Sequence, residues 1–189
     1  SEHWSAGVRT DLSSSTYRNL KSSFDFVPSV EYNIFPYSES TRRQLRMLYG
    51  IGYTYNNYID TTIYEKTEEH LFEQTLDIAY RVQQRWGSVN VSFEASSFLH
   101  DLSRYRIELD GWVSIRIIKG LSLSLRGGVA KINNQITLPK GGADEAEILL
   151  RLQELRTAYS IDGSIGFTYT FGSIYNNIVN PRFGNGRYR

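Results

Sequence analysis

The chain has 189 residues, of which 40% are hydrophobic and 14% aromatic, and its formal net charge is +1. It contains no cysteine, which excludes disulfides, thiolate metal sites and cysteine nucleophiles. The near-neutral charge argues against a nucleic-acid-binding protein, because such proteins normally carry a clustered basic face. No run of about 18 apolar residues occurs, so no transmembrane helix is expected. The length fits one domain, or part of a larger one.

Apolar and polar residues alternate with a period of two in eight segments of the chain. A β-strand sends successive side chains to opposite faces, so each segment has one apolar and one polar face. Pro28 lies inside the second segment and marks a bulge or a weakly paired point, because proline cannot donate a ladder hydrogen bond. The alternation predicts strands at residues 4–12, 24–34, 45–55, 72–83, 89–99, 105–117, 121–129 and 159–171.

The segment 105–117 is the clearest of the eight. Tyr105, Ile107 and the following odd positions are mostly apolar, whereas Arg106 and Glu108 begin a charged series at even positions. The segment is longer than a soluble strand of about 5–6 residues. It is long enough for the roughly 9–11 tilted residues with which a strand crosses a bilayer.

The connections are also informative. Tight turns are expected at residues 85–88 and 119–120, and longer links at 60–68, 100–103 and 133–155. Short turns at one end and long loops at the other are typical of outer-membrane barrels. This pattern places the tight turns on the periplasmic side and the long links outside. The link 34–43 is longer than a tight turn and fits the pattern least well.

Residues 143–156 are not strand-like. They contain strong helix formers, acidic residues in the first turn and an apolar stripe at helical spacing (Ile148, Leu149, Leu152 and Leu155). We predict a short amphipathic helix in the last external loop, either packed over the rim or serving in gating or partner docking. Residues 1–172 would then form the barrel, and residues 173–189 a periplasmic tail.

Alternation alone fits two architectures. A soluble, lipocalin-like barrel has its apolar face inside, and a membrane barrel has it outside. The mean hydropathy of -0.40 does not exclude the membrane version, because a polar interior dilutes the apolar residues. Long strands, and aromatic faces too large for a small interior, favour an all-β, antiparallel transmembrane β-barrel with about eight long strands. Its polar lumen is expected to hold a charge-paired network of Arg9, Glu31, Arg46, Glu73, Asp77, Arg81, Glu94, Arg106, Glu108, Asp110, Arg116, Arg126 and Asp162.

Motifs for catalysis or cofactor binding are not found. The three histidines are far apart in sequence and make no metal motif, and neither a nucleophile elbow nor a Walker loop occurs. His100 and Asp101 are adjacent in an expected loop but have no nucleophile beside them. The sequence therefore predicts no catalytic residue, metal or cofactor, and the carboxylates are interpreted as ion-pair partners.

Particular stretches carry a resemblance beyond the alternation, at residues 32–45, 97–103, 116–122, 135–139, 147–151 and 169–183. Together they resemble the C-terminal part of a family of uncharacterised bacterial outer-membrane β-barrel proteins, found in Bacteroidetes and related phyla. The resemblance covers most of the chain and implies a bacterial outer-membrane location, but it transfers no activity and no site residues. Family members carry further sequence before this point, which implies a fragment of a barrel with more than eight strands. Phe171 would suit the aromatic end of the last strand, but residues 172–189 follow it.

These observations predict a structural or anchoring barrel that contacts outer-membrane lipid and is a subunit of a larger envelope complex. Neither enzymatic activity nor nucleic-acid binding is expected. The alternatives are a pore or transporter for small solutes, which needs a wider barrel, and a soluble ligand-binding barrel. An enzyme with its site at the barrel rim is a further alternative.

Overall fold

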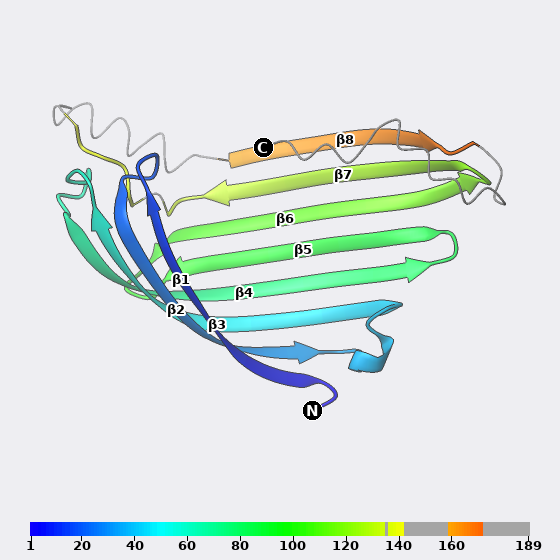
Figure 1. The fold of residues 1–189 in the computed structure, drawn as a ribbon, viewed down its shortest axis with the longest axis horizontal. Helices are drawn as coiled ribbons and strands as arrows, with labels where there is room; N and C mark the ends of the chain where they lie inside the picture. Colours follow the sequence, from blue (N-terminus) through cyan, green and yellow to red (C-terminus); the bar gives the residue numbers. More distant parts are fainter. Residues whose placement is uncertain (135, 142–158, 172–189) are drawn as a thin grey trace, which may run out of the picture.

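The computed structural model describes residues 1–134, 136–141 and 159–171 and forms one curved antiparallel sheet (Figure 1). Each strand pairs with its neighbours in sequence, in the order β1 to β8. A short 3-10 helix, η1 (Tyr37–Glu39), lies between the second and third strands. The strands are β1 (Trp4–Ser15), β2 (Leu20–Asn33), β3 (Arg43–Tyr58), β4 (Glu68–Gln84), β5 (Gly87–Phe98), β6 (Asp101–Ile118), β7 (Leu121–Ile132) and β8 (Tyr159–Tyr169).

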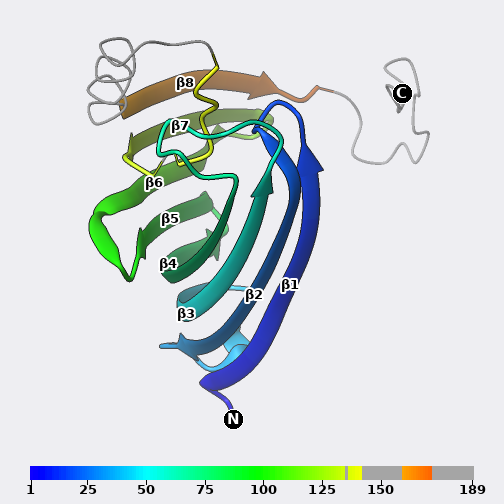
Figure 2. The same ribbon diagram turned by 90° about the vertical axis from the view of Figure 1, so that its left-hand side faces the viewer.

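The prediction of an all-β chain with eight long antiparallel strands is confirmed, but the sheet is not closed into a barrel. Among the described residues, β1 and β8 pair only with β2 and β7, so each has a free edge. Figure 2 shows the sheet bent into an open trough with β1 and β8 on its two rims. The first strands cross the others at a steep angle in Figure 1, which carries β1 away from β8. The predicted helix at 143–156 and the tail at 173–189 lie outside the described residues.

The register places apolar and polar side chains in separate rows, which lie on opposite faces of the sheet. Neighbouring residues on all eight strands form the row Trp4, Tyr32, Met47, Ile78, Phe93, Leu109, Val129 and Ile161. The next row, on the opposite face, is Ser5, Glu31, Leu48, Asp77, Glu94, Glu108, Ala130 and Ser160. One face of the sheet is therefore apolar and the other mainly polar.

The polar face is the concave one. Leu71 of β4 and Phe98 of β5 lie on this face and pack against Ile136, which belongs to the segment after β7. That segment lies inside the curve of the sheet (Figure 2). The apolar face is therefore convex and points outward. No helix in the described part of the chain is long and apolar enough to span a membrane.

The expected link at 100–103 is wrong. β5 ends at Phe98 and β6 begins at Asp101, so the connection consists of Leu99 and His100 alone. The Asp101 carboxylate accepts hydrogen bonds from the Ser103 backbone N–H (3.1 Å) and hydroxyl (2.6 Å), and these local bonds start β6 early. The turn between β1 and β2 is also tight, so both short and long connections occur at this end of the sheet.

Two glycines on the concave side of β3 allow close packing against β2. A Cβ on Gly50 would lie 2.6 Å from Ser29 Oγ and 3.1 Å from Val27 Cγ1, and one on Gly52 would lie 3.0 Å from Val27 Cγ2. Val27 is 7% exposed in this position. Glycine within a strand commonly marks such a close approach or a bend, so this pair supports the inward curve of β2 and β3.

We predict that Gly50→Ala lowers the free energy of unfolding by about 1–3 kcal/mol, because the new methyl group overpacks this contact. Gly7→Ala is the matched control, since nothing lies within 4 Å of its added Cβ. The control should be neutral or stabilising by up to about 1 kcal/mol, as expected when alanine replaces a strand glycine. Urea unfolding of the refolded variants measures both. Equal stabilities would contradict the close approach.

Candidate functional site: the concave face and its cap

All thirteen charged residues predicted to share an interior lie on the concave face. The register places each at a position of the polar parity on its own strand. Two ion pairs join members of this set in the described residues: Arg46 Nε lies 3.8 Å from Glu31 Oε2, and Arg106 pairs with Glu108. The remainder of the expected network stays a prediction.

Carboxylates are adjacent at the centre of this face. Asp77 of β4 lies opposite Glu94 of β5, which in turn lies opposite Glu108 of β6. Like charges directly opposite one another destabilise a sheet unless water or counter-ions screen them. The centre of the concave face therefore suits a hydrated surface better than a dry one. An open hollow on the concave face, toward the β4–β5 turn, has a volume of about 490 Å³.

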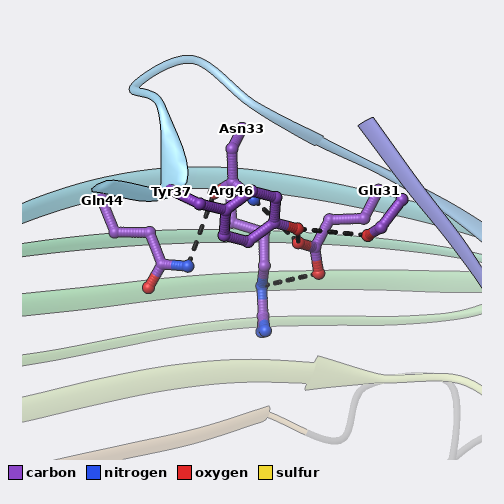
Figure 3. Close-up of polar contacts among 6 residues, drawn as sticks. Glu31, Asn33, Tyr37, Gln44 and Arg46 are labelled. Carbon is purple, nitrogen blue, oxygen red and sulfur yellow. Dashed lines mark hydrogen bonds and ion pairs between the residues drawn. The ribbon is translucent and has the colours of Figure 1, made fainter. Parts of the chain in front are cut away.

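A polar cluster lies at the end of the trough where β2 meets β3 (Figure 3). The Tyr37 hydroxyl and the Asn33 side-chain amide both donate to Glu31 Oε1, at 2.5 and 2.8 Å. Gln44 Nε2 donates to Asn33 Oδ1 at 3.4 Å, which joins β3 to the cluster. Arg46 Nε is buried beside Glu31 without a hydrogen bond in the described structure. Tyr37 belongs to η1, in the 34–42 connection. The cluster therefore explains the length of this connection, which folds back onto the end of the trough to reach Glu31.

The same connection carries a surface ion pair. Glu39 pairs with Arg43 four residues later, and this hydrogen bond is the main reason why the pKa of Glu39 lies below its usual value. A carboxyl with a lowered pKa contributes stability above its ordinary pKa, and that contribution is lost as the pH falls through the lowered value. The Arg43 guanidinium also lies 4.3 Å from the centre of the Phe35 ring.

The other end of the trough is covered by two chain segments, residues 59–67 and 136–140, which we call the cap. Thr62 and Pro139 form an isolated antiparallel bridge. The Ile63 N–H donates to the Leu138 carbonyl (2.9 Å), and the Lys140 N–H donates to the Thr61 carbonyl (2.8 Å). Ile63 and Ile136 are 6% and 5% exposed, so the cap has an apolar underside.

Asn19 fastens the cap to the turn between β1 and β2. Its side-chain amide donates to the carbonyls of Asp60 (2.9 Å) and Thr137 (3.0 Å), and its Oδ1 accepts from the Asp60 N–H (2.8 Å). The residue is 3% exposed and has a φ of 57°, in the left-handed region that asparagine tolerates better than most residues. One side chain therefore joins three connections that are far apart in sequence.

The adjacent residues His100 and Asp101 have structural roles. The His100 ring stacks on Phe98 with 5.7 Å between ring centres. The Asp101 carboxylate pairs with Arg104 at 3.0 Å as well as with Ser103. In the described residues no group of three or more histidine, aspartate, glutamate or cysteine side chains could hold a metal ion.

Sequence reasoning did not identify Asn19, Tyr37 or the cap. Their roles depend on contacts between connections, which period-two alternation does not report. The one available signal was apolar residues at Ile136 and Leu138, just before Pro139, within a link expected to be a loop.

Comparison of the chain with family models, curated proteins and solved structures finds no match. The family resemblance seen in the sequence therefore stays a prediction.

We predict that Glu31→Gln lowers the free energy of unfolding by about 1–3 kcal/mol, because Arg46 loses its counter-charge and two charge-assisted hydrogen bonds weaken. Tyr37→Phe is the control, since it removes one donor and keeps the ion pair, and should cost about 1 kcal/mol. Urea unfolding at low salt measures both. A loss for Glu31→Gln no larger than for Tyr37→Phe would contradict the role given to the carboxylate charge.

We predict that Asn19→Ala loosens the cap and costs about 2–4 kcal/mol, because it removes three partly buried hydrogen bonds and leaves alanine at a positive φ. Asn19→Gly relieves the backbone strain without restoring the bonds, and should recover about 1 kcal/mol of this loss. The specific readout is hydrogen exchange. The Ile63 and Lys140 amides should exchange faster in both variants, while β5 and β6 amides keep their rates. Unchanged rates at Ile63 and Lys140 would contradict the fastening role.

Proposed function

We propose that the chain forms part of the wall of a β-barrel in the bacterial outer membrane and serves as a structural or anchoring element. In this arrangement the convex face contacts lipid and the concave face lines a hydrated interior. The observation that carries the proposal is the combination of an exposed apolar outer face with a polar inner face.

The burial of apolar side chains supports this orientation. The buried hydrophobic residues of the described chain all lie on the concave side or in the cap: Leu20, Val27, Tyr58, Ile63, Leu71, Phe98 and Ile136. On the convex face, by contrast, Ile161 and Ile165 are each 72% exposed and Leu109 is 44% exposed. Soluble monomers rarely expose contiguous apolar patches larger than a few hundred Å². A soluble ligand-binding barrel would have the opposite orientation, with its apolar face inside.

Aromatic residues near the two ends of the convex face support a membrane location. Tyr159 and Tyr169 mark the two ends of β8, with Ile161 and Ile165 between them. Ten residues of strand extend about 33 Å, or about 25 Å along the membrane normal at a tilt of ~40°, which matches the apolar band of an outer-membrane barrel. Other aromatic residues toward the two ends are Trp4, Tyr32, Tyr53, Tyr55, Tyr80 and Tyr105.

The proposal requires partners for the two free edges. Backbone N–H and C=O groups cannot remain unpaired in lipid, and only closed barrels satisfy this for strands. The edges of β1 and β8 must therefore pair with further strands in the membrane. This requirement supports a role within a larger barrel or envelope complex.

The cap supports an anchoring role over an open pore. It covers the end of the trough between the β1–β2 turn and the end of β7, through contacts with the polar face. We therefore expect no stepwise current in planar bilayers at concentrations where the chain inserts. Discrete conductance steps would favour the alternative, a pore for small solutes.

Membrane insertion is tested by a matched pair of lysine substitutions at mid-strand. Leu109→Lys places a charge on the convex face of β6 and should cost about 2–4 kcal/mol in lipid vesicles. Ser92→Lys is on the concave face of β5, opposite Asp110, and should cost less than about 1 kcal/mol. Urea unfolding from vesicles measures both. Equal small costs, or a monodisperse folded monomer without detergent or lipid, would contradict the proposal.

A further inference from the structure

A cavity of about 510 Å³ lies between the cap and the concave face. We call it the cap cavity. Its walls come from several elements: β1 and β6 approach from opposite sides, β2, β3 and β4 form the floor, and Asn134, Ile136 and Thr137 cover it. Its volume lies within the range of about 300–1,000 Å³ found for small-molecule sites.

Three arginines from separate parts of the chain line this cavity. Arg9 comes from β1, Arg18 from the β1–β2 turn and Arg106 from β6. In the described structure Arg9 and Arg18 make no ion pair, and Arg106 pairs with Glu108 of its own strand, which is not part of the lining. At least two guanidinium groups are therefore available to an anion from solution.

Two carboxylates also line the cavity, and one is already engaged. Asp25 accepts a hydrogen bond from the Thr54 hydroxyl at 2.5 Å. The Ser23 hydroxyl donates to Asn56 Oδ1 at 2.7 Å on the same floor. These paired groups hold the floor in place. Glu73, Thr75 and Asn134 add a carboxylate, a hydroxyl and an amide to the lining, which suits hydroxyl groups on a ligand.

We infer that the cap cavity is a binding site for a small hydroxylated molecule that carries one carboxylate or phosphate group. The guanidinium fork matches such an oxyanion in geometry and charge. The remaining hydroxyl, amide and carboxylate groups of the lining bind the hydroxyl groups. This site depends on the cap and the concave face, and it does not require that the convex face contacts lipid.

The experiment is a calorimetric titration of the refolded full chain in detergent micelles. The probes are glucuronate, glucose 6-phosphate and the neutral analogue glucose. At least one acidic sugar should bind at least tenfold more tightly than glucose, because a charge-assisted hydrogen bond contributes about that factor. The tighter of the two acidic probes identifies the natural acid group as carboxylate or phosphate.

Arginine variants locate the binding. Arg9→Gln and Arg18→Gln should each weaken binding of the acidic sugar about tenfold. Neither side chain makes an ion pair in the described structure, so the fold should be retained, and circular dichroism checks this. Arg116→Gln is the matched control, because Arg116 lies on the same face in β6 and does not line the cavity. Its affinity should be unchanged.

Three results would overturn the inference: equal affinity for glucose and both acidic sugars, wild-type affinity in Arg9→Gln and Arg18→Gln, or an equal loss in Arg116→Gln. The last would indicate non-specific attraction to a basic surface. None of these outcomes depends on Leu109→Lys and Ser92→Lys, so failure of this site and failure of the membrane proposal are distinguishable.

Discussion

The structure depends on one constraint: each strand has an apolar face and a polar face, and the sheet curves with the polar face inside. Burial of apolar surface is normally the dominant favourable term in folding. Here the residues that would supply it, such as Leu109 and Ile165, point away from the interior. Burial of this apolar surface can stabilise the fold only where an apolar medium covers the convex face. Water can at the same time solvate the carboxylates that lie side by side on β4, β5 and β6.

Polar side chains hold the connections at the two ends of the trough. Asn19 joins three connections at one end, and Glu31 collects Tyr37, Asn33 and Arg46 at the other. Both clusters are partly shielded from solvent, so their hydrogen bonds are stronger than those of fully exposed groups. They hold connections against the concave face, while the register of the strands is set by the alternation itself. The cap cavity is a consequence of this arrangement, because the cap covers a polar surface.

Alternation in the sequence was enough to predict the eight strands and the face on which the thirteen charged residues of the expected interior lie, because successive side chains of a strand point to opposite faces. The contacts between connections could not be predicted. Asn19 and Tyr37 bind residues that are remote in sequence. Asp101 forms local hydrogen bonds at the start of β6, so residues 101–103 belong to this strand and not to a loop. Alternation also could not predict whether the sheet closes into a barrel. It determines the face on which a side chain lies, but it does not determine which strand pairs with an edge strand. For the same reason the free edges of β1 and β8 became visible only in the structure.

The most direct test of the account is the environment of consecutive side chains along β6. Because the chain has no cysteine, single cysteines can be placed at each position from 106 to 117 and labelled with an environment-sensitive fluorophore in lipid vesicles. We expect strict alternation: labels at odd positions are quenched by brominated lipid, and labels at even positions by iodide in the water. The same environment at all positions, or the reverse alternation, would contradict a lipid-facing convex side and a hydrated concave side.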